Sequence, residues 1–188
     1  MRKGKNLTKK NRKKMLLHCC CGPCSSNVTG ELLKDYEVTL FYYNPCIFDL
    51  QEYNRRLDAL KVVANYYKVK LIVVPYNQNE FYEEIIGFEQ EKEGGSRCNK
   101  CIFQRLKATC FYAKQNGFDI FTTTLSVSPH KKAEVINDIG SKLSKELEID
   151  YLESNFKKNN GFLKSIEMSK KLGLYRQNYC GCKFSMKK

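Results

Sequence analysis

The amino-acid sequence predicts a single-domain α/β fold in which a parallel β-sheet is flanked by helices. Short apolar segments of strand length alternate along the chain with longer segments whose apolar residues recur at helical spacing. Such repeated strand–helix units are typical of a parallel sheet whose faces are covered by helices. The 188 residues are enough for one hydrophobic core, and no internal repeat or low-complexity linker divides them.

The first half of the chain begins with a short apolar strand and continues with three helices and two further strands. Leu57, Leu60 and Val63 recur at helical spacing and predict the longest of these helices, and the apolar run KLIVVPY predicts the third strand. The predicted elements are a strand at 15–18, a helix at 25–34, a strand at 37–43, a helix at about 50–68, a strand at 70–76 and a short helix near 80–86.

The second half repeats this alternation. A long helix is expected to end before Gly117, because glycine is the usual residue just past a helix C-terminus. The predicted elements are a helix at about 99–116, a strand at 119–125, a helix at about 131–147, a strand near Tyr151 and a helix at 161–172.

The positive charge of the chain is concentrated at its N-terminus. The net charge is +13, and residues 1–14 contain eight Lys and Arg residues and no acid, so residues 15–188 carry a net charge of +5. We therefore expect a basic disordered tail over 1–14 and a catalytic domain over 15–188. A basic tail favours a polyanionic partner such as nucleic acid, and an alternative of equal weight is a solvated tail with no partner.

The ten cysteines indicate metal or redox chemistry and not a disulfide scaffold. Four of them crowd into residues 19–24, where adjacent thiols cannot easily find separate disulfide partners. No run of eighteen apolar residues predicts a membrane span, and no signal peptide is recognised. We therefore expect a cytoplasmic protein without membrane contact, where clustered thiols usually bind metals or act in catalysis.

Three cysteine groups stand out from the single cysteines. They are Cys20-Cys21-x-x-Cys24, Cys98-x-x-Cys101 and Cys180-x-Cys182. A parallel sheet brings its loops to the carboxyl edge of its strands, where ligands bind, so the three groups are expected to share one site. Soft thiolates select zinc, copper(I) or iron–sulfur clusters, and cysteine pairing alone leaves zinc and a cluster open.

The surplus of thiols favours redox chemistry over a closed zinc site. A structural zinc site uses four thiolates, which leaves Cys180 and Cys182 as a vicinal pair whose strained disulfide would be labile. Residues 21–24 also form the CGPC sequence of thioredoxins, between a predicted strand and helix. A thioredoxin-like dithiol exchanger is less favoured, because it does not need Cys20 or the other paired thiols.

Several further residues keep alternative explanations. Cys19 and Cys110 are expected to pack in the core, and Cys46 follows a predicted strand and either reaches the site or packs. His18 is expected to be a buried, hydrogen-bonded strand-end histidine more often than a ligand. Other polar candidates with ordinary structural explanations are His130, Asp49, Asp119, Arg97 and Arg105.

With these groups identified, the chain resembles the QueH-type epoxyqueuosine reductases, metalloenzymes of the queuosine tRNA-modification pathway. The resemblance covers nearly the whole chain from about residue 15. The motifs that carry it are HCCCGPCS at 18–25, FYYNPCI at 41–47, EYNRR at 52–56, RCNKCIFQRL at 97–106 and YRQNYCGCKFS at 175–185. One departure is Cys46, where the family often has Asn, which makes it a candidate extra thiol.

The resemblance implies a Rossmann-like fold of the HUP type and a two-electron deoxygenation. The epoxide of epoxyqueuosine, at the wobble position of tRNA, becomes the alkene of queuosine in the last step of its biosynthesis. The matching positions imply that Cys20, Cys21, Cys98 and Cys101 hold a [4Fe-4S] cluster. They also imply that Cys180 and Cys182 form a redox-active disulfide and that Cys24 binds an additional iron ion.

The implied partners are tRNA carrying epoxyqueuosine and an unidentified electron donor. Basic side chains expected to contact tRNA phosphates are those of the tail together with Lys131, Lys132, Lys157 and Lys158. Two other functions remain as alternatives. One is a zinc-stabilised tRNA-binding protein without redox activity, and the other is an ATP-using sulfur-transfer enzyme, for which the expected S-G-G-x-D phosphate loop is missing after the first strand.

Overall fold

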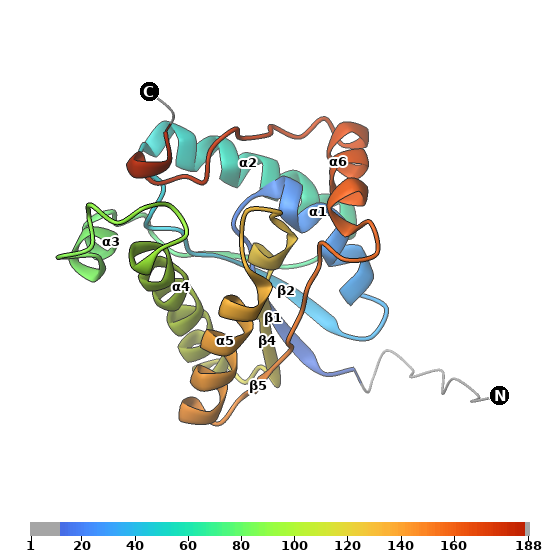
Figure 1. Ribbon diagram of the computed structural model, residues 1–188. Coiled ribbons are helices and arrows are strands. Elements are labelled where there is room, and N and C mark those ends of the chain that lie inside the picture. Colours follow the sequence, from blue (N-terminus) through green and yellow to red (C-terminus); the bar gives the residue numbers. More distant parts are fainter. Residues whose placement is uncertain (1–11, 187–188) are drawn as a thin grey trace.

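The centre of the fold is a five-stranded parallel sheet in a computed structural model that describes residues 12–186 (Figure 1). The strand order is β3-β2-β1-β4-β5, and every neighbouring pair is parallel. The strands are β1 (Lys14–His18), β2 (Glu37–Tyr42), β3 (Leu71–Val73), β4 (Ile120–Thr123) and β5 (Asp150–Tyr151). The predicted single-domain α/β fold with a parallel sheet is confirmed.

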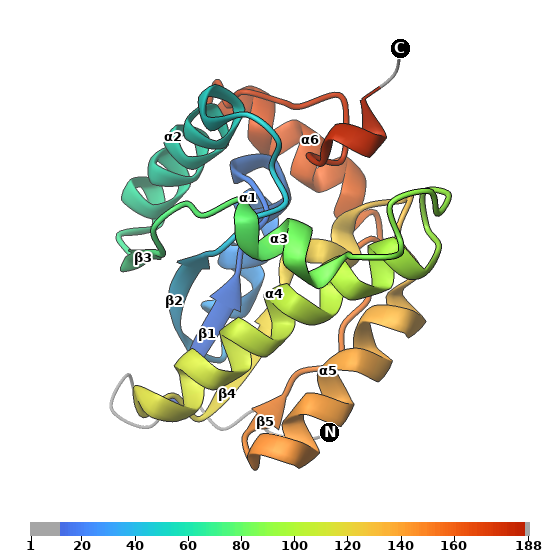
Figure 2. The same ribbon diagram turned by 90° about the vertical axis from the view of Figure 1, so that its left-hand side faces the viewer.

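Helices cover both faces of the sheet and make three layers (Figure 1 and Figure 2). One layer contains α1 (Gly22–Leu32), α2 (Leu50–Tyr67) and α6 (Gly161–Lys171), and the other contains α4 (Ser96–Gln115) and α5 (Ala133–Leu147). The short helix α3 (Asn79–Glu84) lies beside α4. In residues 12–186 no helix has both the length and the apolar character needed to cross a bilayer.

The alternation of side chains along β1 supplies both halves of the core. Met15 and Leu17 pack toward the layer of α1 and α2, whereas Leu16 packs toward α4 and α5. All three are fully buried. Because both faces of a parallel sheet are covered, the three successive residues 15–17 of its central strand are all apolar, with no alternation of polar and apolar residues. This explains why MLLH was recognisable as a strand from its apolar run.

Two helices begin earlier than predicted, so cysteines expected in loops lie at helix N-termini. The first helix begins at Gly22, three residues before the predicted 25, with Cys21 as its N-cap and Pro23 in its first turn. The long helix begins at Ser96, so Cys98 lies in its first turn. These starts were missed because neither N-cap, Cys21 or Gly95, has a side chain that caps the helix, and the usual Ser, Thr, Asp or Asn signal is absent.

The strand following the long helix ends earlier than predicted. It stops at Thr123, and a short 3-10 helix over Thr124–Val127 follows it. The Thr123 side-chain oxygen accepts a hydrogen bond from the backbone nitrogen of Leu125 and caps this turn. The third strand is also shorter, with three residues, and ends before Pro75, whose ring nitrogen has no proton to donate to a ladder.

Most of the predicted basic tail, residues 1–11, lies outside the described residues. The last three residues of the predicted tail, 12–14, are described and make defined contacts. The Arg12 guanidinium donates to the carbonyl of Leu33, Lys13 pairs with Asp150 at 2.7 Å, and Lys14 is the first residue of β1.

Candidate functional site

Three cysteines gather at the carboxyl end of β1. The sulfur atoms of Cys20, Cys21 and Cys24 all lie within 4.8 Å of one another, and those of Cys20 and Cys21 are 3.7 Å apart. Among residues 12–186, this is the one group of three or more metal-ligand side chains that are so close together. Cys98 and Cys101 are not part of it. The structure therefore brings three of the predicted metal ligands within 4.8 Å of one another, and the other two line an adjoining cavity.

Hydrogen bonds to neighbouring strands position this triad. The Cys20 backbone nitrogen donates to the hydroxyl oxygen of Thr124 at 3.2 Å, and the Asn44 amide donates to the Cys19 carbonyl at 2.9 Å. Gly22 is required because a Cβ there would lie 2.6 Å from backbone atoms of Ala59 in α2. The loop after β1 is therefore held by the ends of β2 and β4 and pressed against α2.

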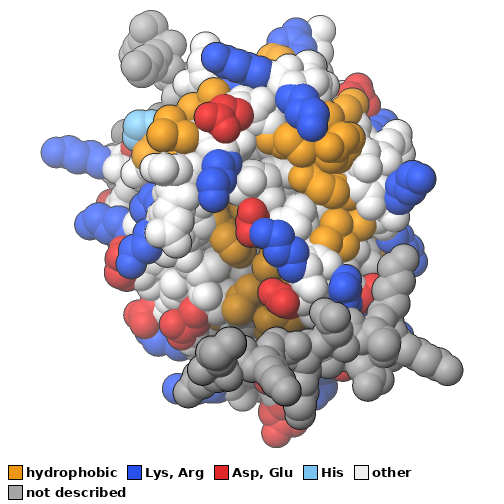
Figure 3. All heavy atoms as spheres, turned by 90° about the vertical axis from the view of Figure 1, so that its right-hand side faces the viewer, with side chains coloured by type: hydrophobic (Ala, Val, Ile, Leu, Met, Phe, Trp, Pro, Cys, Tyr) orange, Lys and Arg blue, Asp and Glu red, His pale blue; other side chains and the backbone are white. Residues whose placement is uncertain are grey.

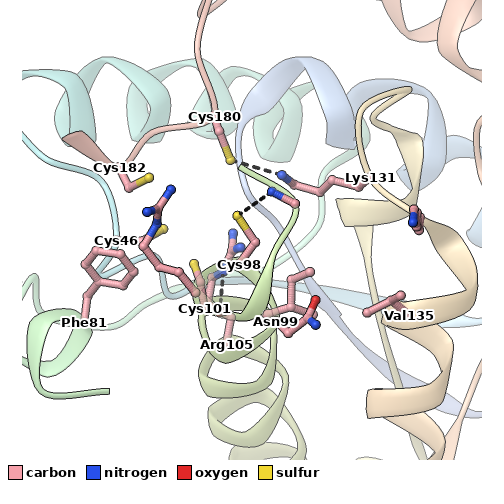
Figure 4. A pocket seen from close by; sticks show the side chains of 14 residues that line it. Cys46, Phe81, Cys98, Asn99, Cys101, Arg105, Lys131, Val135, Cys180 and Cys182 are labelled. Carbon is pink, nitrogen blue, oxygen red and sulfur yellow. Dashed lines mark hydrogen bonds between the residues drawn. The ribbon is translucent and has the colours of Figure 1, made fainter. Parts of the chain in front are cut away.

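The other paired cysteines surround a second cavity between the N-terminus of α4 and the C-terminal segment (Figure 4). Figure 4 shows Cys98 and Cys101 on α4 with Cys180 and Cys182 on the facing segment. Cys46, which follows β2, also lines this cavity. All ten cysteines of the chain are free thiols. The cavity thus has five thiols on its wall, one of which was predicted only as a candidate extra thiol.

A wider cleft lies beside this cavity, and Cys20 and Cys24 open into it. Its volume is about 630 Å³, within the range of pockets that hold small ligands. The cleft and the cavity share three wall residues, Arg105, Lys131 and Cys180. The two groups of cysteines therefore lie on either side of one set of basic side chains.

Arg105 and Lys131 place positive charge between the thiols. Arg105 is 3% exposed; its burial acts to lower the pKa, but the nearby Cys101, Cys46 and other thiols outweigh burial and raise the pKa. The Lys131 nitrogen lies 3.0 Å from the sulfur of Cys180, and its pKa is raised in the same way despite burial. Both groups stay cationic and favour thiolates beside them.

The pKa values of the three triad cysteines shift in opposite directions. Hydrogen bonds from Cys21 and Cys24 lower the pKa of Cys20 well below its ordinary value. The hydrogen bond with Cys20, together with burial, raises the pKa of Cys21 to about 12, and hydrogen bonds with Cys20 and Cys21 raise the pKa of Cys24 well above its usual range. In the second cavity, the hydrogen bond from Cys101 lowers the pKa of Cys46 to about 6. In each cavity one thiol is therefore shifted toward the thiolate, the form in which cysteine binds metals.

Most of the remaining single candidates have structural roles. His18 is fully buried; its ring nitrogens contact the Thr123 hydroxyl at 2.8 Å and the Tyr43 carbonyl at 3.1 Å, and burial lowers its pKa to about 4. Cys19 and Cys110 are fully buried, as expected for core residues. Two carboxylates accept backbone hydrogen bonds, Asp49 as the N-cap of α2 and Asp119 from the nitrogen of Lys14.

Other predicted residues differ in their environment. Arg97 is buried, donates to the carbonyl of Glu89 and lies over the ring of Phe184, while His130 lies on the wall of the cleft. Lys131, expected to contact phosphate, instead contacts Cys180. Lys157 donates to the carbonyl of Lys131 at 2.6 Å.

Three site residues were not singled out from the sequence. Thr124 contacts Cys20, the Gln177 amide donates to the Cys21 sulfur at 2.9 Å, and Arg56 donates to the carbonyl of Cys180. A signal that could have pointed to Arg56 is the four-residue spacing of Glu52 and Arg56 within EYNRR, which is typical of an ion pair on a helix. Thr124 and Gln177 had no comparable signal.

Comparisons with known proteins match one family along nearly the whole chain. The family model described as epoxyqueuosine reductase QueH matches residues 15–188. The chain is 37% identical over 182 residues to "Epoxyqueuosine reductase QueH" of Streptococcus pyogenes, covering 94% of this chain and 71% of that protein. The protein of the same description from Thermotoga maritima is 33% identical over 175 residues. The match covers 92% of this chain and 90% of that protein.

Solved structures of similar fold are more distant in sequence. The U34-tRNA thiolase NcsA from Methanococcus maripaludis, solved with its [4Fe-4S] cluster, superposes with a TM-score of 0.58 at 15% identity, covering 97% of this chain and 65% of that one. A predicted subunit of a tRNA methyltransferase from Methanocaldococcus jannaschii superposes with a TM-score of 0.54 at 12% identity. The superposition covers 82% of this chain and 74% of that one. At such identities the likeness concerns the fold.

Proposed function

This chain belongs to the epoxyqueuosine reductase QueH family and is an enzyme of queuosine tRNA modification, and we propose that it uses its cysteine site to deoxygenate epoxyqueuosine at the wobble position of tRNA. The reaction takes two electrons and two protons, and it converts the epoxide to an alkene and water. The observation that carries the proposal is the arrangement of cysteines from three distant motifs on either side of Arg105 and Lys131.

The proposed ligands of a [4Fe-4S] cluster are Cys20 and Cys21 from the triad and Cys98 and Cys101 from α4. The donor set fits such a cluster, because it consists of reduced thiols, includes thiolate-forming members, and lies beside cations that offset thiolate charge. Bound there, the cluster supplies one-electron transfer and Lewis acidity. The proximity of Cys24 to the first two supports an additional iron ion at that position.

The chain's own residues supply a pair of reducing equivalents. We assign this role to Cys180 and Cys182, which exchange two thiols for one disulfide. Lys131 holds positive charge against the Cys180 sulfur, and burial raises the pKa of Cys182, so the two thiols differ in reactivity. Tyr179 stacks against the guanidinium of Arg56, with 5.0 Å between Arg56 Cζ and the ring centroid, and we assign it a packing role.

Binding of tRNA is assigned to the rim of the cleft. With Lys131 and Lys157 engaged with other protein groups, the basic side chains proposed for phosphate contacts are Arg176 on the wall of the cleft, Lys132 on the wall of the adjoining cavity, and Lys158. On the face shown in Figure 3, Lys and Arg side chains are spread widely and do not gather in one patch. This favours contacts at several points of a large substrate. We expect a separate electron donor and a cytoplasmic location, where the thiols stay reduced.

A zinc site is the second candidate, because three sulfurs within 4.8 Å of one another also suit tetrahedral zinc. Anaerobic purification followed by assays of iron, zinc and acid-labile sulfide distinguishes the two. We expect brown protein containing iron and sulfide in the wild type, and loss of both in Cys98→Ser. The matched control is Cys110→Ala, which removes a buried thiol far from the site and should retain both.

Activity is tested separately with tRNA from cells that lack epoxyqueuosine reduction. The reduced wild-type enzyme should convert epoxyqueuosine to queuosine, as measured by nucleoside mass spectrometry, and Cys180→Ser should not. A colourless, folded protein without iron would contradict the cluster. Iron-containing protein that leaves epoxyqueuosine unchanged, with a reductant of the cluster present, would contradict the reaction.

A further inference from the structure

The backbone on both sides of Cys180 is held by one buried arginine. Arg56 of α2 is 2% exposed, and its two terminal nitrogens donate to the carbonyls of Cys180 at 2.9 Å and of Tyr179 at 3.2 Å. These contacts join residues more than a hundred positions apart in sequence. The guanidinium therefore fixes two successive peptide groups of the segment that carries the Cys180-Gly181-Cys182 pair.

Arg56 is itself fixed from the other side. Its third nitrogen donates to the carboxylate of Glu52 at 2.7 Å, in an ion pair whose two side chains are both less than a tenth exposed. The second oxygen of Glu52 accepts a hydrogen bond from the Tyr175 hydroxyl at 2.7 Å. Because a planar guanidinium donates in fixed directions, this ion pair sets where the carbonyls of the C-terminal segment must lie.

Gly181, between the two cysteines, is held just as closely. Its carbonyl accepts from the Phe48 backbone nitrogen at 2.9 Å, and its φ of 133° is in the region that favours glycine. A Cβ at this position would lie 3.0 Å from a terminal nitrogen of Arg56. The three successive carbonyls of residues 179–181 are therefore all engaged while both thiols are free.

We propose that the Glu52–Arg56 pair is a positioning device that stabilises the dithiol form of Cys180 and Cys182 against closure to the disulfide. Closure needs a tight ring across Gly181, and rotation of these peptide groups would break the bonds to Arg56. The inference rests on the proposed redox role of the cysteine pair. In the reaction, closure removes two electrons and two protons from the thiols, and the epoxide takes them up to give alkene and water.

This proposal predicts a shift in the thiol–disulfide equilibrium. Replacing Arg56 by lysine keeps a positive charge but cannot hold both carbonyls and Glu52 at once. We expect Arg56→Lys to form the disulfide about tenfold more readily, equivalent to a midpoint potential about 30 mV lower. Gly181→Ala, which crowds the same guanidinium, should shift the equilibrium in the same direction.

The measurement uses the full-length protein, purified without oxygen and equilibrated in buffers of reduced and oxidised dithiothreitol, in which the oxidised dithiothreitol takes up the two electrons and two protons. After alkylation of free thiols and tryptic digestion, cleavage at Arg176 and Lys183 releases a peptide with Cys180 and Cys182 as its two cysteines. Mass spectrometry of this peptide gives the disulfide fraction without interference from the other eight thiols. Iron content and the circular dichroism spectrum check that each variant is folded and loaded.

The matched control is Arg55→Lys, since Arg55 is the exposed neighbour on the same helix and its guanidinium faces the Tyr175 ring. Its equilibrium should equal that of the wild type. Equal equilibria in wild type, Arg55→Lys and Arg56→Lys would overturn the positioning role while leaving the redox pair intact. A wild-type peptide that never contains the disulfide at any buffer ratio would overturn the redox pair itself. Glu52→Gln, which keeps a hydrogen-bond acceptor for Arg56, should give a smaller shift than Arg56→Lys.

Discussion

The side-chain nitrogen of Lys131 lies 3.0 Å from the sulfur of Cys180, and Lys131 lines both the cavity with five thiols and the cleft beside it. Lys131 follows β4 and the short 3-10 helix, whereas Cys180 is in the C-terminal segment. An ammonium group in contact with a sulfur stabilises negative charge that develops on it in a reaction. The contact therefore distinguishes Cys180 from Cys182 within the pair.

Removing the charge of Lys131 should make Cys180 less reactive. In Lys131→Met with the pair reduced, we expect alkylation of Cys180 at neutral pH to slow by about tenfold, since no ammonium group then stabilises negative charge on the attacking sulfur. The rate is measured by mass spectrometry on the peptide of residues 177–183, with fragmentation to separate the two cysteines. Lys132→Met is the matched control, and equal rates in both variants would show that the contact does not govern reactivity.

The loop after β1 should not tolerate a larger residue at Gly22. The Cβ of Gly22→Ala would lie 2.6 Å from the Ala59 backbone, so α1 must move away from α2. We expect a loss of about 1–3 kcal/mol in the free energy of unfolding by urea. Gly30→Ala in the same helix has the Tyr67 side chain as its nearest neighbour, which can move more easily than backbone, and it should cost less. An equal loss in the two variants would contradict a special role for the backbone contact.

Thr124 should stabilise both the fold and the triad. Its hydroxyl accepts from the Cys20 nitrogen at 3.2 Å and lies 3.5 Å from the Cys20 sulfur, to which it donates. Thr124→Val keeps the shape but leaves a buried donor unpaired, at a cost of about 1–3 kcal/mol. We also expect iron to be lost faster to a chelator, followed by absorbance. Thr109→Val is the control, because Thr109 is buried on α4 and its hydroxyl donates to a carbonyl of the same helix. If both variants lost iron at the same rate, Thr124 would have no specific role in holding the metal site.

Cys24 should affect the additional iron and not the cluster. Cys24→Ser is expected to contain about one iron ion fewer per chain with unchanged acid-labile sulfide, since serine is a poor ligand for soft metal sites. Iron and sulfide analysis of anaerobically loaded protein checks this. Loss of the sulfide as well would make Cys24 a cluster ligand, and unchanged iron would leave no metal at this position.

The N-terminal basic segment should contribute to tRNA affinity through charge alone. Deleting residues 2–11 removes five Lys and Arg residues. The dependence of the logarithm of the binding constant on the logarithm of salt concentration should become less steep, by roughly 0.7 for each phosphate of single-stranded RNA that the segment no longer neutralises. Binding is measured over a series of salt concentrations. A variant with these five residues changed to Gln should behave like the deletion, and an unchanged slope would exclude the segment from binding.

The order of strands and helices was largely predictable, because burial patterns are local. The apolar run of β1 and the helical spacing in α2 each follow from residues close together in sequence. Helix starts at Gly22 and Ser96 were less predictable, since their N-caps lack the usual polar side chains. As a result, the position of Cys98 in the first turn of α4 was not foreseen.

The sequence by itself determined the kind of chemistry, because the preference of thiolates for soft metals and the strain of a C-x-C pair are properties of the residues and their spacing. Only the tertiary structure decided which groups meet. It joined Cys24 to Cys20 and Cys21, brought Cys46 beside Cys101, and placed Lys131 and Arg56 against Cys180 across 49 and 124 positions of sequence. Such contacts depend on how helices pack on the sheet and where the loops at its carboxyl edge lie, and no local pattern encodes them.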